Sequence, residues 1–288
     1  MSAAAPGTKA GGWREQAPLI FPALMLLAFF VVPFGLMIAV SLFERVAGGF
    51  YQPVLTTANY ARFLSLFFGK ILVFSLGLSA LVSALCLIVG APFTYLLTKL
   101  RRRWQVPWLV AMLAVLSLSE VIIGFSWSTL LSRTAGLSNL FVSLGLMDNP
   151  DAWTPGFFAV LSGMTYQAFP YAVLVLYPSF SRLDPSLAEA ARTLGASPLR
   201  AFFTVILPAL RMALIATFII VFVFALGAYL LPQLLGRPEH WTLSVLITDQ
   251  AIYQSNMPFA AAMAVFLVVT SLSLVLLTTT LGRKGRAA

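Results

Sequence analysis

Apolar residues dominate this chain in six long stretches that are separated by shorter polar segments. A helix needs roughly 20 predominantly apolar residues to cross the hydrocarbon core of a bilayer. Each of the six stretches meets that length, so the pattern predicts an all-α membrane protein with six transmembrane helices. The stretches run at about 17–43, 71–98, 106–131, 156–180, 209–231 and 258–281.

Composition agrees with this pattern and excludes the main soluble classes. Hydrophobic residues make up 60% of the chain and charged residues 9%, whereas a soluble domain carries about 25% charged residues. The single cysteine, Cys86, excludes an intrachain disulfide, and the single histidine, His240, argues against a histidine-based metal site.

The Lys and Arg residues are distributed unequally between the two sides of the predicted topology. Thirteen of the 18 lie in the N-terminal tail, the second-to-third link, the fourth-to-fifth link and the C-terminus, and five lie on the other side. Because basic loops face the cytoplasm, both termini are predicted to be cytoplasmic. The predicted organisation is a tail at 1–16, a six-helix domain at 17–281 and a second tail at 282–288.

The link at about 182–208 is more polar than its surroundings and is punctuated as two short helices. Asp184 followed by Pro185 favours a helix start, and a capping box from Ser186 to Glu189 is an alternative start two residues later. Gly195 is placed to end the first helix, and Ser197-Pro198 favours the start of the second. Leu187, Ala190, Ala191 and Leu194 form a small apolar stripe. From this pattern alone, the first helix either rests on its own bundle or docks a cytoplasmic partner.

The same link resembles the EAA motif of ABC-importer permeases. The matching residues are Glu189, Ala190, Ala191, Gly195, Leu207 and Pro208, while Val205 stands where the family often has isoleucine. Further segments resemble the polyamine, opine and phosphonate branch of the family, notably 57–60, 136–146, 169–174 and 225–236. Ala228 departs from the spermidine/putrescine permeases, which often carry an acid beside that glycine.

This resemblance implies a type I importer permease bundle in the bacterial inner membrane. It implies a second permease subunit, identical or homologous, two cytoplasmic ABC ATPase subunits and an extracytoplasmic substrate-binding protein. The helix containing Glu189 would be the coupling helix, with Glu189 holding the contact, Ala190 and Ala191 permitting close approach, and Gly195 making the turn. Membrane lipid is the remaining expected partner, and no nucleic-acid partner is expected.

ATP and Mg²⁺ are expected on the partner ATPase and no cofactor in this chain. The chain has no G-x-x-x-x-G-K-[ST] sequence, and its only Gly-Lys pair, Gly69-Lys70, lacks the rest of that phosphate-binding loop. The expected role is therefore translocation rather than enzymatic catalysis.

A substrate path is expected around Glu120, the one acid near the middle of a predicted span. An acid inside the membrane is a functional candidate because lipid exposure costs several kcal/mol, although a structural hydrogen bond would also explain it. Other polar candidates are Tyr166, Gln167, Tyr171 and Tyr229. The expected cargo is a polyamine, with an opine, a phosphonate or an amino-acid-like solute as the alternative.

Two other classes fit the sequence less well. A secondary transporter should carry more ionisable groups inside its spans, and we detect no inverted repeat. A membrane-embedded enzyme should carry a Ser-His-Asp, H-E-x-x-H or paired-acid arrangement, none of which the sequence contains.

Overall fold

The computed structural model describes residues 13–284, apart from 47–48, 50 and 135, and the side chains of residues 20–276 within that range. The predicted tails at 1–16 and 282–288 fall largely outside this part of the chain. They remain predictions, as does the domain division that rests on them.

Four helices of the described residues are long and apolar enough to cross a membrane. They cover Ile20–Ser41, Leu66–Lys99, Phe157–Ser181 and Met257–Leu276. Two pairs of helices pass the same test together but are bent, Arg102–Ser117 with Glu120–Leu130 by 98° and Pro198–Ala209 with Arg211–Gly227 by 76°. If each bent pair counts as one broken span, the total is the six that the sequence predicts.

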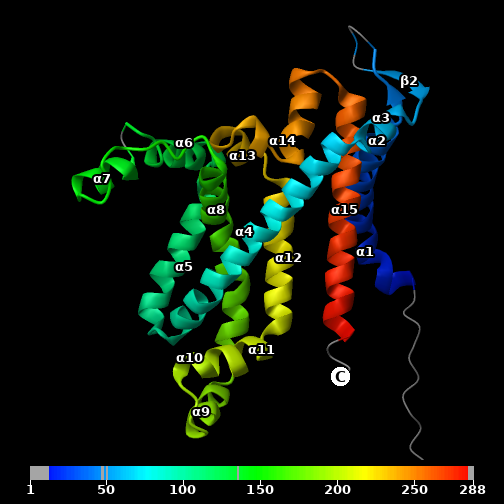
Figure 1. Cartoon of the computed structure of the whole chain (residues 1–288). Helices are drawn as coiled ribbons and strands as arrows, with labels where there is room; N and C mark the ends of the chain where they lie inside the picture. The colour runs from blue at the N-terminus through cyan, green and yellow to red at the C-terminus, as the bar shows by residue number, and fades with distance from the viewer. Residues whose placement is uncertain (1–12, 47–48, 50, 135, 285–288) are drawn as a thin grey trace, which may run out of the picture.

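The elements follow one another with short connections (Figure 1). The first half contains α1 (Trp13–Leu26), η1 (Leu27–Val31), α2 (Val32–Ser41), β1 (Phe43–Glu44), β2 (Gln52–Leu55), α3 (Ala58–Phe63), α4 (Leu66–Lys99), α5 (Arg102–Ser117), α6 (Glu120–Leu130) and α7 (Leu137–Ser143). The second half contains α8 (Phe157–Ser181), α9 (Pro185–Thr193), α10 (Pro198–Ala201), η2 (Phe202–Ile206), α11 (Leu207–Ala209), α12 (Arg211–Gly227), α13 (Leu230–Leu235), η3 (Pro238–His240), α14 (Leu243–Thr248), η4 (Asp249–Tyr253) and α15 (Met257–Lys284).

The core of the bundle is formed by α4, α8 and α12, which pack against one another. Three serines on α4, Ser75, Ser79 and Ser83, are at most 1% exposed, and each hydroxyl donates to the carbonyl four residues earlier. Small side chains with satisfied hydroxyls let neighbouring helices approach closely in a membrane. Ser75 Oγ also accepts a hydrogen bond of 2.8 Å from the Leu243 backbone, which fixes the start of α14 on α4.

The two ends of the bundle carry different segments. Figure 1 shows α9, α10, α11 and the α4–α5 turn at one end, and β2, α3, α6, α7, α13 and α14 at the other. Segments that the sequence assigns to one side of the membrane therefore lie at one end of the molecule. We call these the coupling end and the outer end.

The expected third span at 106–131 is not one straight helix. Leu118 and Ser119 adopt extended backbone, with ψ of 141° and 137°, and the Ser119 hydroxyl accepts a hydrogen bond from the Val121 backbone to start α6. Both flanking segments are apolar, so hydropathy cannot register the break. Glu120 is consequently the first residue of α6, at the bend of this broken span, rather than in the middle of one continuous helix.

The expected fifth span at 209–231 is also interrupted. Leu210 separates α11 from α12 at the 76° bend, and Ala228 has extended backbone with ψ of 128°. The longest continuous helix of this span is therefore Arg211–Gly227, and α13 is a separate short helix at the outer end.

Substituting alanine for Gly163 on α8 is expected to destabilise the bundle by about 1–3 kcal/mol, the usual cost of overpacking. An added Cβ would lie 2.6 Å from Cδ1 of Leu235, a side chain with no exposed surface that cannot move aside easily. Thermal unfolding in mild detergent measures the effect. The matched control is Gly77→Ala on α4, where nothing lies within 4 Å of the new Cβ and loss of a helical glycine should stabilise by about 0.5–1 kcal/mol. Equal melting temperatures for the two variants would contradict the packing argument.

Candidate functional site

The start of α9 is set by Asp184 rather than by the alternative capping box. The Asp184 carboxylate accepts a hydrogen bond of 2.9 Å from the Ser186 backbone, and Pro185 occupies the first helical position. That backbone hydrogen bond, with a smaller contribution from the Ser186 side chain, lowers the pKa of the Asp184 carboxyl. The cap is therefore fully charged at neutral pH.

The end of α9 is a left-handed turn at Gly195, as the sequence predicts. Gly195 has φ of +86°, its N–H donates to the Arg192 carbonyl at 2.9 Å, and the Ala196 N–H donates to the Ala191 carbonyl at 3.0 Å. These two bonds form the Schellman motif, which satisfies the final carbonyl groups of a helix. The direction in which the chain leaves α9 is thus fixed by backbone geometry.

The chain then enters α12 through a wide helical turn. Ser197 caps α10 by accepting a hydrogen bond from the Arg200 backbone, and η2 is a π-helical turn before Leu207 and Pro208. A proline removes one backbone donor and displaces the preceding carbonyl, which accounts for the wide turn. Leu207 packs against the buried cluster that contains Phe202 and Ile206.

The outward face of this segment is apolar. Leu194 is 90% exposed, Leu199 is 72% exposed and Phe203 is 62% exposed, while Leu187 and Ala190 are also exposed. Ala191 is half-buried, and the alanine that packs inward is Ala188, against the cluster around Phe202. The stripe predicted from the sequence therefore does not rest on its own bundle. Leu199 and Phe203 were missed, although their spacing of four in a polar link signals a second helical face.

Glu189 lines a cleft of about 300 Å³ between α9, α10 and the last turns of α4. Lys99 and Arg192 line the same cleft, and the Lys99 ammonium lies 5.3 Å from the centre of the Tyr95 ring. No local pattern predicts that Lys99 and Arg192 line one cleft, because 93 residues separate them.

A second polar cluster lies at the bend between α5 and α6. The Gln167 side-chain amide donates a hydrogen bond of 2.8 Å to Oε1 of Glu120. Gln167 is only 8% exposed, and its Oε1 has no hydrogen-bond partner. Since a carboxylate only accepts, the amide must present its NH₂ group to Glu120, which leaves its own oxygen without a donor. The pair therefore offers unpartnered acceptor oxygens in an otherwise apolar bundle.

The three tyrosines of the expected path lie in different environments. Tyr166 is 39% exposed and packs edge-to-face against Trp127, with ring centres 5.8 Å apart, so it contacts α6, the helix that begins with Glu120. Tyr171 instead packs against Phe224 of α12 at 4.5 Å. Tyr229 is 40% exposed at the break between α12 and α13. In the described part of the chain, neither of these two hydroxyls bonds to Glu120 or Gln167.

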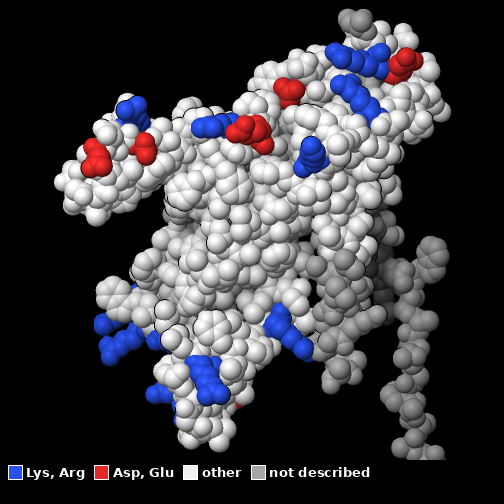
Figure 2. Space-filling view, viewed as in Figure 1, with Lys and Arg blue, Asp and Glu red and all other residues white. Residues whose placement is uncertain are grey.

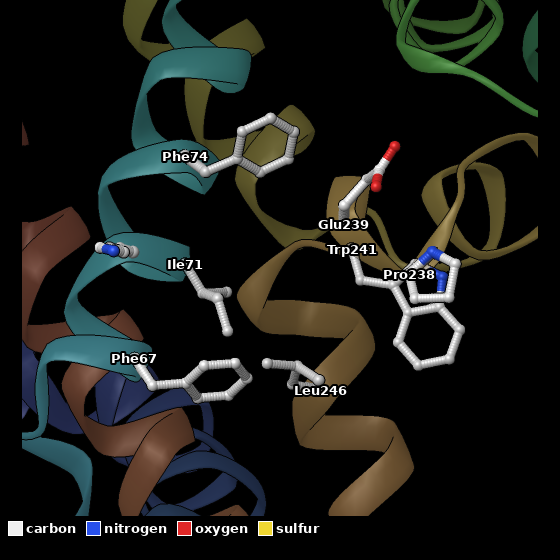
Figure 3. A pocket seen from close by; sticks show the side chains of 8 residues that line it. Phe67, Ile71, Phe74, Pro238, Glu239, Trp241 and Leu246 are labelled. Carbon is white, nitrogen blue, oxygen red and sulfur yellow. The ribbon is translucent and has the colours of Figure 1, made fainter.

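A pocket of about 590 Å³ opens at the outer end between α4 and the η3–α14 loop (Figure 3). Figure 3 shows Phe67, Ile71 and Phe74 on α4 facing Leu246 and Trp241 across it, with Glu239 at its edge. Its walls are mainly aromatic and aliphatic. Within the described residues, no group of three or more His, Cys, Asp or Glu side chains is placed to hold a metal ion.

Comparisons with known proteins agree with this architecture. The family described as "Binding-protein-dependent transport system inner membrane component" matches residues 16–286. The spermidine/putrescine transport system permease protein PotB of Escherichia coli (strain K12) is 30% identical over 85% of this chain and 89% of its own length. PotB of Haemophilus influenzae is 28% identical over 85% of each chain.

Solved structures share the fold at lower identity. A chain of a bacterial ABC transporter involved in the import of the acidic polysaccharide alginate superposes with a TM-score of 0.76 at 19% identity, covering 94% of this chain and 96% of that one. The resemblance inferred from the sequence and the six-span permease bundle are thereby confirmed. The chain belongs to the family of binding-protein-dependent transport system inner membrane components, and it is a multi-pass permease subunit of an ABC importer rather than an enzyme.

Proposed function

We propose that this permease works with a second permease subunit, two cytoplasmic ATPase subunits that dock on α9 and α10, and an extracytoplasmic binding protein that delivers cargo to the outer end. ATP and Mg²⁺ are bound by the ATPase. The exposed apolar face of Leu187, Leu194, Leu199 and Phe203 carries the proposal, because a polar link in water would not leave such side chains uncovered.

The coupling end faces the cytoplasm in this proposal, which places both termini there. Figure 2 shows Lys and Arg side chains at both ends, but those at the lower end, over α5, α9 and α10, have almost no Asp or Glu among them, whereas those at the upper end lie beside acids. Basic segments next to membrane spans stay on the cytoplasmic side. A structural relative, a bacterial alginate ABC transporter in complex with an alginate pentasaccharide-bound periplasmic protein, supports a partner of the binding-protein type.

Packing provides a route from the docking face to the membrane. One buried cluster contains Phe180 of α8 with Phe202 and Ile206 of η2, and Ala188 of α9 and Leu214 of α12 pack against it. Protein interiors are close-packed and not continuously deformable. When ATP closes the ATPase dimer, a displacement of α9 must therefore shift η2 and the start of α12. Alternating access then requires a bundle with two states that ATP and cargo bias differently.

The cargo we propose is a small organic cation of the polyamine type. An ammonium group is a donor without acceptors, and it would complement the free oxygen of Glu120 together with Oε1 of Gln167. The nearby rings of Tyr166 and Trp127 offer faces that attract cations. The named cargo of the PotB relatives, spermidine and putrescine, has this chemistry.

The docking proposal is tested by cross-linking from a cysteine introduced at Leu194, the most exposed of the apolar side chains on α9. The only native cysteine, Cys86, has no exposed surface, so the background is low. In membranes from cells that carry the complete importer, a short thiol-to-amine reagent on the Leu194→Cys variant should join the chain to the ATPase subunit.

The control is a cysteine at Leu144, which is 63% exposed at the outer end. The Leu144→Cys variant should yield no ATPase adduct. An adduct of equal yield from both positions, or none from Leu194→Cys in a transport-competent complex, would overturn the docking proposal.

A further inference from the structure

We propose that the cleft between α4, α9 and α10 binds the phosphodiester headgroup of an anionic phospholipid, and that this lipid fastens the coupling segment to the membrane-spanning core. Two cations, Lys99 and Arg192, reach the cleft from segments that are 93 residues apart. The preference for cytoplasmic positive charge explains why each residue is on this side. It does not explain why the two converge on one cavity.

The surroundings of the cleft are strongly cationic. Arg101, Arg102 and Arg103 follow Lys99 after one leucine, at the N-cap and first positions of α5. Among the described residues, no ion pair joins Lys99, Arg192 or the three arginines at 101–103 to an acid. Glu189 is the one acid that lines the cleft, and it leaves the local charge positive. Basic pockets of this kind between membrane helices favour anionic lipid headgroups.

The cleft also lies at the depth where headgroups are found. Lys99 is the last residue of α4, whose preceding turns are apolar, and the cleft is therefore at the membrane surface. Trp104 is 57% exposed and Trp108 is 46% exposed in the first turns of α5, the helix that follows Lys99 in the chain. Exposed tryptophans are typical of the interface between hydrocarbon and water. Exposed Leu96 and Leu100 provide an apolar surface beside the cleft for an acyl chain.

Occupancy by a phosphate would join two elements that otherwise touch through few polar contacts. No hydrogen bond or ion pair links Lys99 or Tyr95 of α4 to the described residues of α9 or α10. A headgroup phosphate held by Lys99 and Arg192 would supply that link with charge-assisted hydrogen bonds. The binding site stands independently of the transport mechanism, whereas its effect on coupling rests on the proposed function.

Lipid retention measures the binding directly. The complete importer is purified from membranes that contain phosphatidylglycerol, and native mass spectrometry counts the lipid molecules that stay bound. Wild type should retain phosphatidylglycerol on this chain. The Lys99→Ala/Arg192→Ala double variant should bind the lipid roughly thirtyfold more weakly, from about 1 kcal/mol for each basic residue at a membrane surface. The control is Arg182→Ala/Arg200→Ala, which removes the same charge at the same end from residues that do not line the cleft.

Several results would overturn the proposal. Equal losses in the two double variants would mean general attraction of anionic lipid rather than a site. Retention only when the ATPase subunits are absent would mean that a side chain of the ATPase fills the cleft. A second variant guards against misfolding of the alanine variant. Lys99→Arg/Arg192→Lys keeps both positive charges and should retain phosphatidylglycerol as wild type does. Loss of the lipid from a folded complex of this variant counts against the site.

ATP hydrolysis by the complete importer in lipid nanodiscs separates the binding from its consequence. Cargo-stimulated ATP hydrolysis by wild type should be several-fold higher with phosphatidylglycerol present than in phosphatidylcholine alone, and the double alanine variant should lose that difference. If inorganic phosphate in phosphatidylcholine nanodiscs gives the same stimulation, the ligand is free phosphate and the lipid proposal is wrong. If lipid is retained without any stimulation, the binding site holds and the coupling role fails.

Discussion

Replacing Gly195 with valine is expected to abolish ATP-driven uptake while the chain still inserts and assembles. Gly195 has φ of +86°, and no atom lies within 4 Å of an added Cβ, so the cost is backbone strain rather than a clash. A left-handed conformation costs an ordinary residue roughly 1–2 kcal/mol, and valine is worse because its side chain is branched at Cβ. Relaxing that strain breaks the two bonds that end α9 and redirects the exposed Leu194 face.

The measurement is cargo uptake and ATP hydrolysis in proteoliposomes that hold the complete importer. The Gly195→Val variant should hydrolyse ATP without a matching uptake, so the number of cargo molecules moved per ATP falls roughly tenfold or more. Gly195→Asn is the matched control, because asparagine tolerates the left-handed region, and it should keep most of the uptake. If the valine variant transports normally, the geometry of this turn has no part in coupling.

The local chemistry of the coupling segment could be predicted from the sequence residue by residue. Asp184 with Pro185, Gly195, and Ser197 with Pro198 act through side chains and backbone within a few positions of themselves. Such signals do not depend on the rest of the fold. The choice between two candidate starts of α9 required the structure, because both caps were locally acceptable, and so did the exposure of Leu199 and Phe203.

Long-range features could not be predicted in the same way. The break at Leu118–Ser119 carries no proline or glycine, and both flanking helices are apolar, so nothing in the local pattern distinguishes a straight span from a 98° bend. The bend decides where Glu120 lies, and through that its contact with Gln167. The meeting of Lys99 with Arg192 depends equally on how α4 and α9 pack. The sequence marks all five path candidates alike, as polar residues in apolar segments. Only the fold shows that Tyr171 and Tyr229 make their contacts away from Glu120 and Gln167.

Substituting glutamine for Glu120 is expected to lower the maximal uptake rate of a cationic cargo about tenfold or more. Glutamine has nearly the same shape and keeps an oxygen that can accept the 2.8 Å hydrogen bond from Gln167, so the bend between α5 and α6 should persist. The charge is lost, and hydrogen bonds to charged groups are worth about 1.5–3 kcal/mol against about 1 kcal/mol for neutral ones. The cargo concentration for half-maximal uptake should change little, because the separate binding protein sets the first capture step.

Initial rates of labelled putrescine and spermidine uptake, measured with saturating binding protein, report this loss. Asp148→Asn removes an exposed acid from the α7–α8 loop at the outer end and should transport at the wild-type rate. If the two oxygens hold one ammonium group, their effects are not additive. The double variant Glu120→Gln/Gln167→Leu should then take up cargo at nearly the same rate as Glu120→Gln alone. A wild-type rate for Glu120→Gln would make the contact with Gln167 a structural tie across the bend. A loss that is equal for cationic and uncharged cargo would show that Glu120 supports the path without selecting for positive charge.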